Sequence, residues 1–123
     1  MNKILLIDDD LDFNESLTDI LEYEGYEVVC AFDGKQGLDL VKLEQPDLII
    51  SDIIMPDVDG LGFLMALRNE LKSQIKVVII SGGGRVGGTD YLNMAQSLGA
   101  DEVVEKPLDK HDFLERIKRL LAK

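Results

Sequence analysis

The chain has 123 residues, of which 46% are apolar and 30% are charged, a composition typical of one soluble globular domain. Its 13 basic and 24 acidic side chains give a net charge of −11, which disfavours direct binding to DNA or RNA. The sequence contains neither an apolar stretch of about 18 residues nor a secretory leader, so we expect a cytoplasmic protein that does not enter a membrane.

The first half of the chain alternates short apolar stretches with amphipathic ones. In chain order, these stretches predict strand Lys3–Ile7, a helix from about Asp12 to Glu24, strand Glu27–Ala31, a helix after Asp33, and strand Asp47–Ser51. Gly25 supplies a stop for the first helix, and the second ends before Pro46, because the residue before a proline disfavours helical backbone. Cys30 is the only cysteine, so it forms no internal disulfide, which fits a reducing compartment.

The second half continues the same alternation. In chain order, it predicts a helix from about Leu61 to Leu71, strand Lys76–Ile80, a glycine-rich loop Gly82–Gly88, a helix from after Thr89 to Gly99, strand Glu102–Val104, and a last helix after the capping residue Asp109. Repeated strand–helix units predict a doubly wound α/β fold, in which helices cover both faces of a five-stranded parallel sheet. We expect residues 1–123 to form this single domain.

Residues that can bind phosphate or metal follow four of the five predicted strands. Asp8 and Asp9 come after the first strand, Asp52 after the third, Ser81 after the fourth and Lys106 after the fifth. Ligand sites of open α/β sheets lie outside the carboxyl ends of the strands, so we expect these side chains to meet at one edge. The sequence therefore predicts an acidic metal site beside a hydroxyl and an ammonium group that suit phosphate.

This pattern resembles the receiver domain of bacterial two-component response regulators. The resemblance covers essentially the whole chain and rests on residues that occur in the family's order, each at the end of the right strand: the pair Asp8-Asp9, then Asp52 with Met55-Pro56 after it, then Ser81, then Lys106-Pro107. It implies the flavodoxin-like strand order 2-1-3-4-5, which periodicity alone does not fix. It also implies a phosphorylated switch that catalyses its own modification, and not a turnover enzyme.

The resemblance implies that Asp52 is the phosphoacceptor and that Ser81 and Lys106 contact the phosphoryl oxygens. A carboxylate can attack phosphorus and form an aspartyl phosphate if it is held in line and the developing charge is neutralised. Each residue alone also has a structural explanation: a capping aspartate, a turn serine and a surface lysine. Their occurrence together at the strand ends favours the functional interpretation.

The resemblance also implies a Mg²⁺ cofactor held by four residues: Asp9 and Asp52 as direct ligands, Asp8 through water, and Ile54 through its backbone carbonyl. Mg²⁺ prefers hard oxygen ligands and keeps several waters, and adjacent carboxylates repel one another unless a cation intervenes. We leave Asp10 and Asp12 out of this site, because the start of a helix favours acidic residues by itself.

The chain departs from the family pattern at two places. Val103 stands three residues before the lysine, where receivers usually carry an aromatic ring that rotates inward, and the loop Gly82–Gly88 is unusually rich in glycine. We therefore expect ordering of this loop, and not an aromatic switch, to transmit the signal. In the family, the second residue after the phosphorylated aspartate and the second after the serine or threonine influence hydrolysis of the aspartyl phosphate. Here these residues are Ile54 and Gly83, and neither can position a water by hydrogen bonding, so we expect slow self-dephosphorylation.

The resemblance implies two kinds of protein partner. A sensor histidine kinase or a phosphotransfer protein would supply the phosphoryl group, and a downstream protein would bind around the fourth helix, fifth strand and last helix. The chain could also form a homodimer. His111 is interpreted as a surface residue and not as a phosphodonor. Two alternatives stay open: a receiver-like scaffold without phosphorylation, which Val103 favours, and a Mg²⁺-dependent phosphatase, which lacks an evident general acid.

Overall fold

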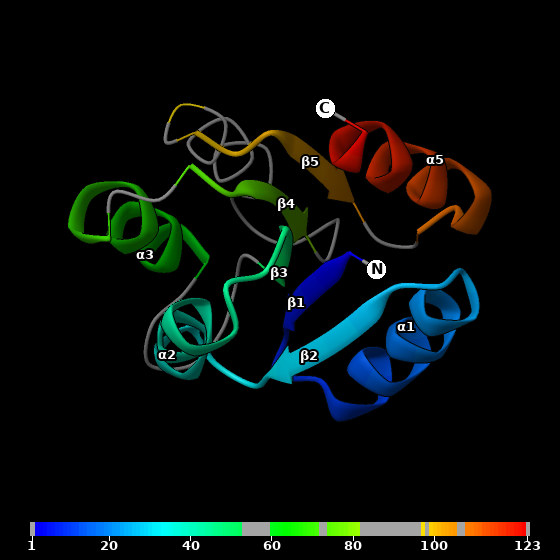
Figure 1. The fold of residues 1–123 in the computed structure, drawn as a ribbon, viewed down its shortest axis with the longest axis horizontal. Helices are drawn as coiled ribbons and strands as arrows, with labels where there is room; N and C mark the ends of the chain where they lie inside the picture. Colours follow the sequence, from blue (N-terminus) through cyan, green and yellow to red (C-terminus); the bar gives the residue numbers. More distant parts are fainter. Residues whose placement is uncertain are drawn as a thin grey trace.

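The computed structural model describes residues 2–52, 60–71, 74–81, 97, 99–105 and 108–122. Within them, strands alternate with helical segments from Lys3 to Ser81, and a further strand and helix follow (Figure 1). The elements are β1 (Lys3–Ile7), α1 (Leu11–Tyr23), β2 (Glu27–Ala31), α2 (Gly34–Glu44), β3 (Leu48–Asp52), α3 (Gly60–Met65), the π-helical segment η1 (Ala66–Glu70), β4 (Lys76–Ser81), β5 (Glu102–Glu105) and α5 (Lys110–Leu121).

The five strands form one parallel sheet in the order β2-β1-β3-β4-β5. This order confirms the predicted flavodoxin-like topology, in which the chain starts near the middle of the sheet and extends it on both sides. Helices α1 and α5 cover one face of the sheet, and α2 and α3 cover the other (Figure 1). Among the described residues, no helix is long and apolar enough to cross a lipid bilayer.

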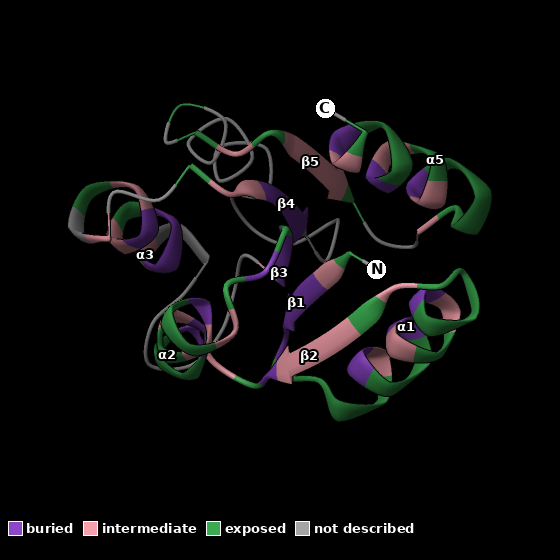
Figure 2. Cartoon of the chain, in the orientation of Figure 1, coloured by how far each residue is buried: buried purple, intermediate pink, exposed green. Residues whose placement is uncertain are grey.

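Each face of the sheet carries its own hydrophobic core, because successive side chains of a strand point to opposite faces. Leu5 and Ile7 of β1 pack on the α2–α3 side with Phe63, whereas Ile4 and Leu6 pack on the α1–α5 side with Phe113. These four residues of β1 are fully buried, and most of β1 has the colour of buried residues in Figure 2. Burial on both faces explains why the strands read as continuous apolar runs and not as alternating ones.

The helix starts agree with the capping residues in the sequence. Asp10, Asp33 and Asp109 each accept a hydrogen bond from the backbone N–H three residues later, at the N-termini of α1, α2 and α5. Gly25 follows α1 with a φ of +97°, a left-handed conformation that strains other residues. The predicted role of Asp10 at a helix start is thereby confirmed.

The third helix differs from the prediction. The α-helical part ends at Met65, and residues Ala66–Glu70 continue as a π-helical turn in which the N–H of Leu71 donates to the carbonyl of Ala66 at 3.0 Å. Such turns insert one residue into the helical repeat, and a pattern of five side chains is too short to distinguish them from α-helix. The helix predicted between Thr89 and Gly99 lies almost entirely outside the described residues.

Candidate functional site

The register of the sheet places the first acidic residues beside the third strand. Ile7 pairs with Ser51 across β1 and β3, so the next residues, Asp8 and Asp52, lie side by side at the carboxyl edge of the sheet. Asp52 is the last residue of β3 and pairs with Ile80 of β4. The sequence brings these carboxylates together because apolar strands of equal length are buried in register.

Hydrogen bonds hold Asp8 at three of its atoms, and the residue is only 1% exposed. Its backbone N–H donates to the carbonyl of Ala31 at 3.2 Å, and its Oδ1 accepts from the backbone N–H of Asp10 at 2.9 Å. Its backbone carbonyl accepts from Nδ2 of Asn14 at 2.7 Å. Hydrogen bonds from N–H groups stabilise a buried carboxylate, so Asp8 forms the fixed inner wall of the site.

Three carboxylates meet at this edge. Asp8, Asp9 and Asp52 each present an oxygen, and these oxygens lie within 4.8 Å of one another. Asp8 is buried, Asp52 is half-buried and Asp9 is exposed, so the cluster opens to solvent on the side of Asp9. Hard oxygen donors at this spacing, accessible from water, fit a divalent cation such as Mg²⁺, which also keeps water ligands.

The end of β3 is braced by the residue before the aspartate. Ser51 is fully buried, and its hydroxyl donates to the backbone carbonyl of Asp52 at 2.9 Å. The backbone on either side of the Asp52 carboxylate is therefore constrained, by the β-ladder before it and by this hydrogen bond. A constrained backbone limits the positions that the Asp52 carboxylate can take.

The other predicted site residues are only partly described. The backbone of Ser81 ends β4 and pairs with Glu105 of β5, which places it at the same edge of the sheet as Asp52. Lys106 and Ile54 lie outside the described residues, as do the loop Gly82–Gly88 and Pro107. Val103 pairs with Ile79 and packs, half-buried, on the α2–α3 side of the sheet.

Sequence reasoning missed two residues that support the acidic cluster, Ser51 and Asn14. Ser51 reads as one more polar residue at a strand end, and no sequence pattern distinguishes its role. Asn14 could have been found, because it lies three and seven residues before Leu17 and Leu21 and thus belongs to the buried stripe of α1. A polar residue within such a stripe usually has a hydrogen-bonding role.

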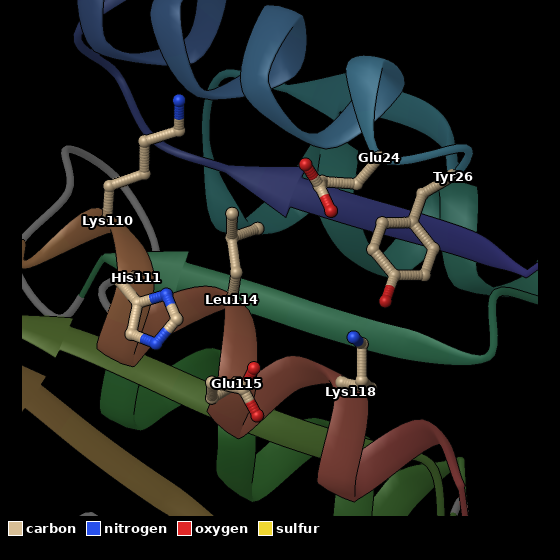
Figure 3. A pocket seen from close by; sticks show the side chains of 7 residues that line it. All are labelled: Glu24, Tyr26, Lys110, His111, Leu114, Glu115 and Lys118. Atoms are coloured by element: carbon tan, nitrogen blue, oxygen red, sulfur yellow. The ribbon is translucent and has the colours of Figure 1, made fainter.

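A separate hollow of about 360 Å³ lies on the α1–α5 side of the molecule. Figure 3 shows residues of α5, among them His111 and Lys118, facing Glu24 and Tyr26 in the segment that joins α1 to β2. His111 is exposed in the first turn of α5, which agrees with its interpretation as a surface residue. None of the three clustered carboxylates lines this hollow.

The sequence matches known proteins along nearly its whole length. The family model of the response regulator receiver domain matches residues 4–118. The transcriptional regulatory protein CpxR of Escherichia coli is 37% identical over 127 residues, which cover 100% of this chain and 50% of CpxR. The probable transcriptional regulator ycf27 of Cyanophora paradoxa is 37% identical over 98% of this chain and 48% of its own length. The chain thus spans about half the length of these curated relatives.

Solved structures give the same result for the fold. The receiver domain of the Francisella response regulator 1452 superposes with a TM-score of 0.89 and 28% sequence identity, covering 99% of this chain and 98% of that one. A CheY-like response regulator receiver domain protein from Methanospirillum hungatei gives a TM-score of 0.87 and 32% identity, over 99% of this chain and 94% of that one. Both similarities extend over nearly the whole chain.

Proposed function

This chain belongs to the family of response regulator receiver domains, and we propose that it accepts a phosphoryl group on Asp52 from a phosphohistidine of a sensor kinase or phosphotransfer protein. The observation that carries the proposal is the cluster of Asp8, Asp9 and Asp52, whose oxygens lie within 4.8 Å of one another at the carboxyl edge of the sheet. Asp52 is the half-buried member, at the end of a central strand.

The proposed step is a displacement at phosphorus. An oxygen of the Asp52 carboxylate forms a bond to the phosphorus atom while the bond between phosphorus and the histidine nitrogen breaks, and the nitrogen keeps the electron pair. Phosphoryl transfer needs little covalent assistance and depends on positioning and on neutralisation of charge. The hydrogen bond from Ser51 and the β-ladder supply the positioning on the acceptor side.

Asp9 and Asp52 would hold Mg²⁺ directly, with Asp8 acting through water and the backbone carbonyl of Ile54 as a further ligand. When bound, the ion supplies positive charge that offsets both the carboxylates and the phosphoryl oxygens. Asp9 is exposed and can exchange ligands with solvent, whereas Asp8 is fixed by its hydrogen bonds. This difference in exposure supports an open, exchangeable site over a closed structural one.

Ser81 and Lys106 would contact the phosphoryl group once it is on Asp52. Ser81 reaches this edge because β4 ends there, and Lys106 directly follows Glu105, the last residue of β5. A hydroxyl donates one hydrogen bond, and the lysine ammonium acts as a point charge on a long side chain. Together they would make the phosphorylated state distinguishable from the free one.

Exposed apolar side chains beside the acidic cluster support a protein as the phosphodonor. Leu11 is 64% exposed and follows the acidic residues at the start of α1. Phe32 is 41% exposed and follows Ala31, whose carbonyl accepts the hydrogen bond from Asp8. Apolar residues that border a polar site suit a protein interface better than contact with a small anion alone.

The output would be a population shift that a partner protein or a second copy of the chain reads on the side of β5 and α5. Arg116 of α5 donates to Glu102 of β5 at 2.6 Å, so an ion pair links these two elements. Val103 lacks the aromatic ring that in the family usually transmits the signal from the phosphorylation site to this face. We expect ordering of the loop Gly82–Gly88 to transmit it instead. Hydrogen exchange with and without beryllofluoride tests this, and unchanged exchange at Gly82–Gly88 contradicts it.

Labelling with acetyl phosphate separates the proposed function from its alternatives. We expect intact-mass spectrometry to show one stable phosphoryl adduct on wild-type protein in Mg²⁺ and no adduct on Asp52→Ala. Absence of an adduct on the wild type would favour a non-phosphorylated scaffold. Release of phosphate over many turnovers without an adduct would favour a phosphatase.

A further inference from the structure

Asn14 is a polar residue in the buried stripe of α1. It lies in the first turn and a half of the helix, is 2% exposed, and shares its side of α1 with Leu17 and Leu21. These two leucines belong to the core on the α1–α5 side of the sheet. An apolar residue would suit this position, so the presence of an amide needs a separate explanation.

The amide of Asn14 is oriented by one short hydrogen bond. Its Nδ2 donates to the backbone carbonyl of Asp8 at 2.7 Å. The opposite orientation would bring two acceptor oxygens together, so the assignment of nitrogen and oxygen in this side chain follows from its contact. Asn14 therefore holds the peptide of Asp8 from the side of α1, while Ala31 and Asp10 hold its backbone nitrogen and its carboxylate.

The oxygen of the same amide gives a second, independent observation. Oδ1 of Asn14 is buried, and no hydrogen-bond partner for it is found in the part of the chain that the structure describes. A buried acceptor without a donor is unfavourable for folding. An asparagine at this position is thus poorly explained by stability and is better explained by what its NH₂ group does to Asp8.

We propose that Asn14 is a positioning residue of the acidic site, which fixes Asp8 and thereby the geometry that Asp8, Asp9 and Asp52 offer to a divalent cation. The inference rests on the proposed function, since it concerns the same site. Asn14 does not touch the cation; it acts through the Asp8 peptide. Groups that orient the ligands of a metal commonly change its affinity by about 10- to 100-fold when they are removed.

The test compares wild type with Asn14→Leu and Asn14→Ala in a Mg²⁺ titration followed by NMR of backbone amides. We expect the Kd for Mg²⁺ to rise about tenfold in both variants. We also expect the Tm of Asn14→Leu to stay within about 5 °C of wild type, because the lost hydrogen bond is offset by removal of the buried amide oxygen. Unchanged Mg²⁺ affinity in a folded variant would overturn the proposal.

Thr18→Val is the matched control. Thr18 lies one turn further along α1, is half-buried, and its hydroxyl hydrogen-bonds to Sγ of Cys30 at 3.2 Å, away from Asp8. We expect this variant to bind Mg²⁺ like wild type. If Thr18→Val weakens Mg²⁺ binding as much as the Asn14 variants do, removal of any polar side chain from α1 disturbs the site, and a specific role of Asn14 is overturned.

A measurement without metal separates this proposal from the proposed function. The backbone N–H of Asp10 donates to Oδ1 of Asp8, so its NMR shift and hydrogen exchange report whether that carboxylate stays in place. We expect both to change in Asn14→Leu and to stay constant in Thr18→Val, in metal-free buffer. If wild type gives no Mg²⁺-dependent shifts, the metal site fails; if the Asp10 amide is unchanged in Asn14→Leu, the positioning role fails.

Discussion

Removing the charge of Asp9 should make the metal-free protein more stable. Two unit charges 4.8 Å apart repel by about 3.5 kcal/mol at an effective dielectric constant of 20 and by about 0.9 kcal/mol in water. Asp9 faces both Asp8 and Asp52 but is exposed, so the value for water is the better guide for each pair. Asp8 also adjoins Asp9 in the unfolded chain, so folding adds mainly the repulsion from Asp52. Asp9→Asn should therefore raise the free energy of unfolding by about 1 kcal/mol, which at this chain length raises Tm by roughly 4 °C.

The assay is thermal unfolding by circular dichroism, in EDTA and in millimolar Mg²⁺. Mg²⁺ should raise the Tm of wild type, because a ligand that binds only the folded state stabilises it, and should raise the Tm of Asp9→Asn much less. Asp12→Asn is the matched control, since Asp12 lies in the same helix start but outside the cluster. It should lower stability by about 0.5 kcal/mol, because the helix dipole favours a negative charge there.

Two results would refute this reasoning. If metal-free Asp9→Asn melts at or below the temperature of wild type, the three carboxylates do not repel one another as their spacing requires. If Asp12→Asn is stabilised as much as Asp9→Asn, the gain comes from the overall charge of −11 and not from the cluster.

Three further outcomes are expected. The pKa of Lys3 is raised above its ordinary value of 10.5, mainly by the hydrogen bond with Glu44. The charged Lys3 therefore stabilises the folded protein fully at pH values below 10.5, and this stabilisation is lost as pH rises past the folded-state pKa. Urea unfolding should thus show Lys3→Met less stable than wild type at neutral pH and equal to it at strongly alkaline pH; a constant difference would contradict this. Nη1 and Nη2 of Arg68 donate to the carbonyls of Ile75 and Gly99 at 2.7 and 2.8 Å, so Arg68→Met should lower the free energy of unfolding, measured with denaturant, by about 2–3 kcal/mol. Arg68→Lys should recover less than half of this loss, because the single nitrogen of an ammonium does not span two sites that the two nitrogens of a planar guanidinium reach. An unaltered denaturation midpoint in Arg68→Met would show that these bonds contribute nothing net. The phosphorylated protein should lose its phosphoryl group slowly, since the residues two past Asp52 and Ser81, Ile54 and Gly83, cannot position water; mass spectrometry over time would contradict this by showing loss within seconds.

The sheet could be predicted from the sequence because its strands are buried on both faces. Runs such as Ile4–Ile7 and Leu48–Ile50 are too short for helices and too apolar for loops, so their ends, and hence the places of Asp8 and Asp52, follow directly. The order of the strands did not follow from these runs, because periodicity carries no information on which strands are neighbours. That order came from resemblance to a family and is confirmed by the pairing of β1 with both β2 and β3.

The support of the site could not be predicted in the same way. Helical spacing places Asn14 on the buried side of α1, but the partner of a buried amide depends on how α1 lies on β1, which is a tertiary property. The same applies to Ser51, whose hydroxyl turns back to the carbonyl of Asp52. The π-helical turn after Met65 was missed because it differs from α-helix by one residue in a single turn.

The central claim is that Asp52 carries the phosphoryl group, and peptide mapping after acetyl phosphate treatment tests it most directly. Wild type is phosphorylated in Mg²⁺, digested, and sequenced by tandem mass spectrometry, with a parallel sample in EDTA. The account predicts modification of Asp52 alone, and only in the sample with Mg²⁺. A phosphoryl group on Asp8 or Asp9, or equal labelling of Asp52 in EDTA, would contradict it.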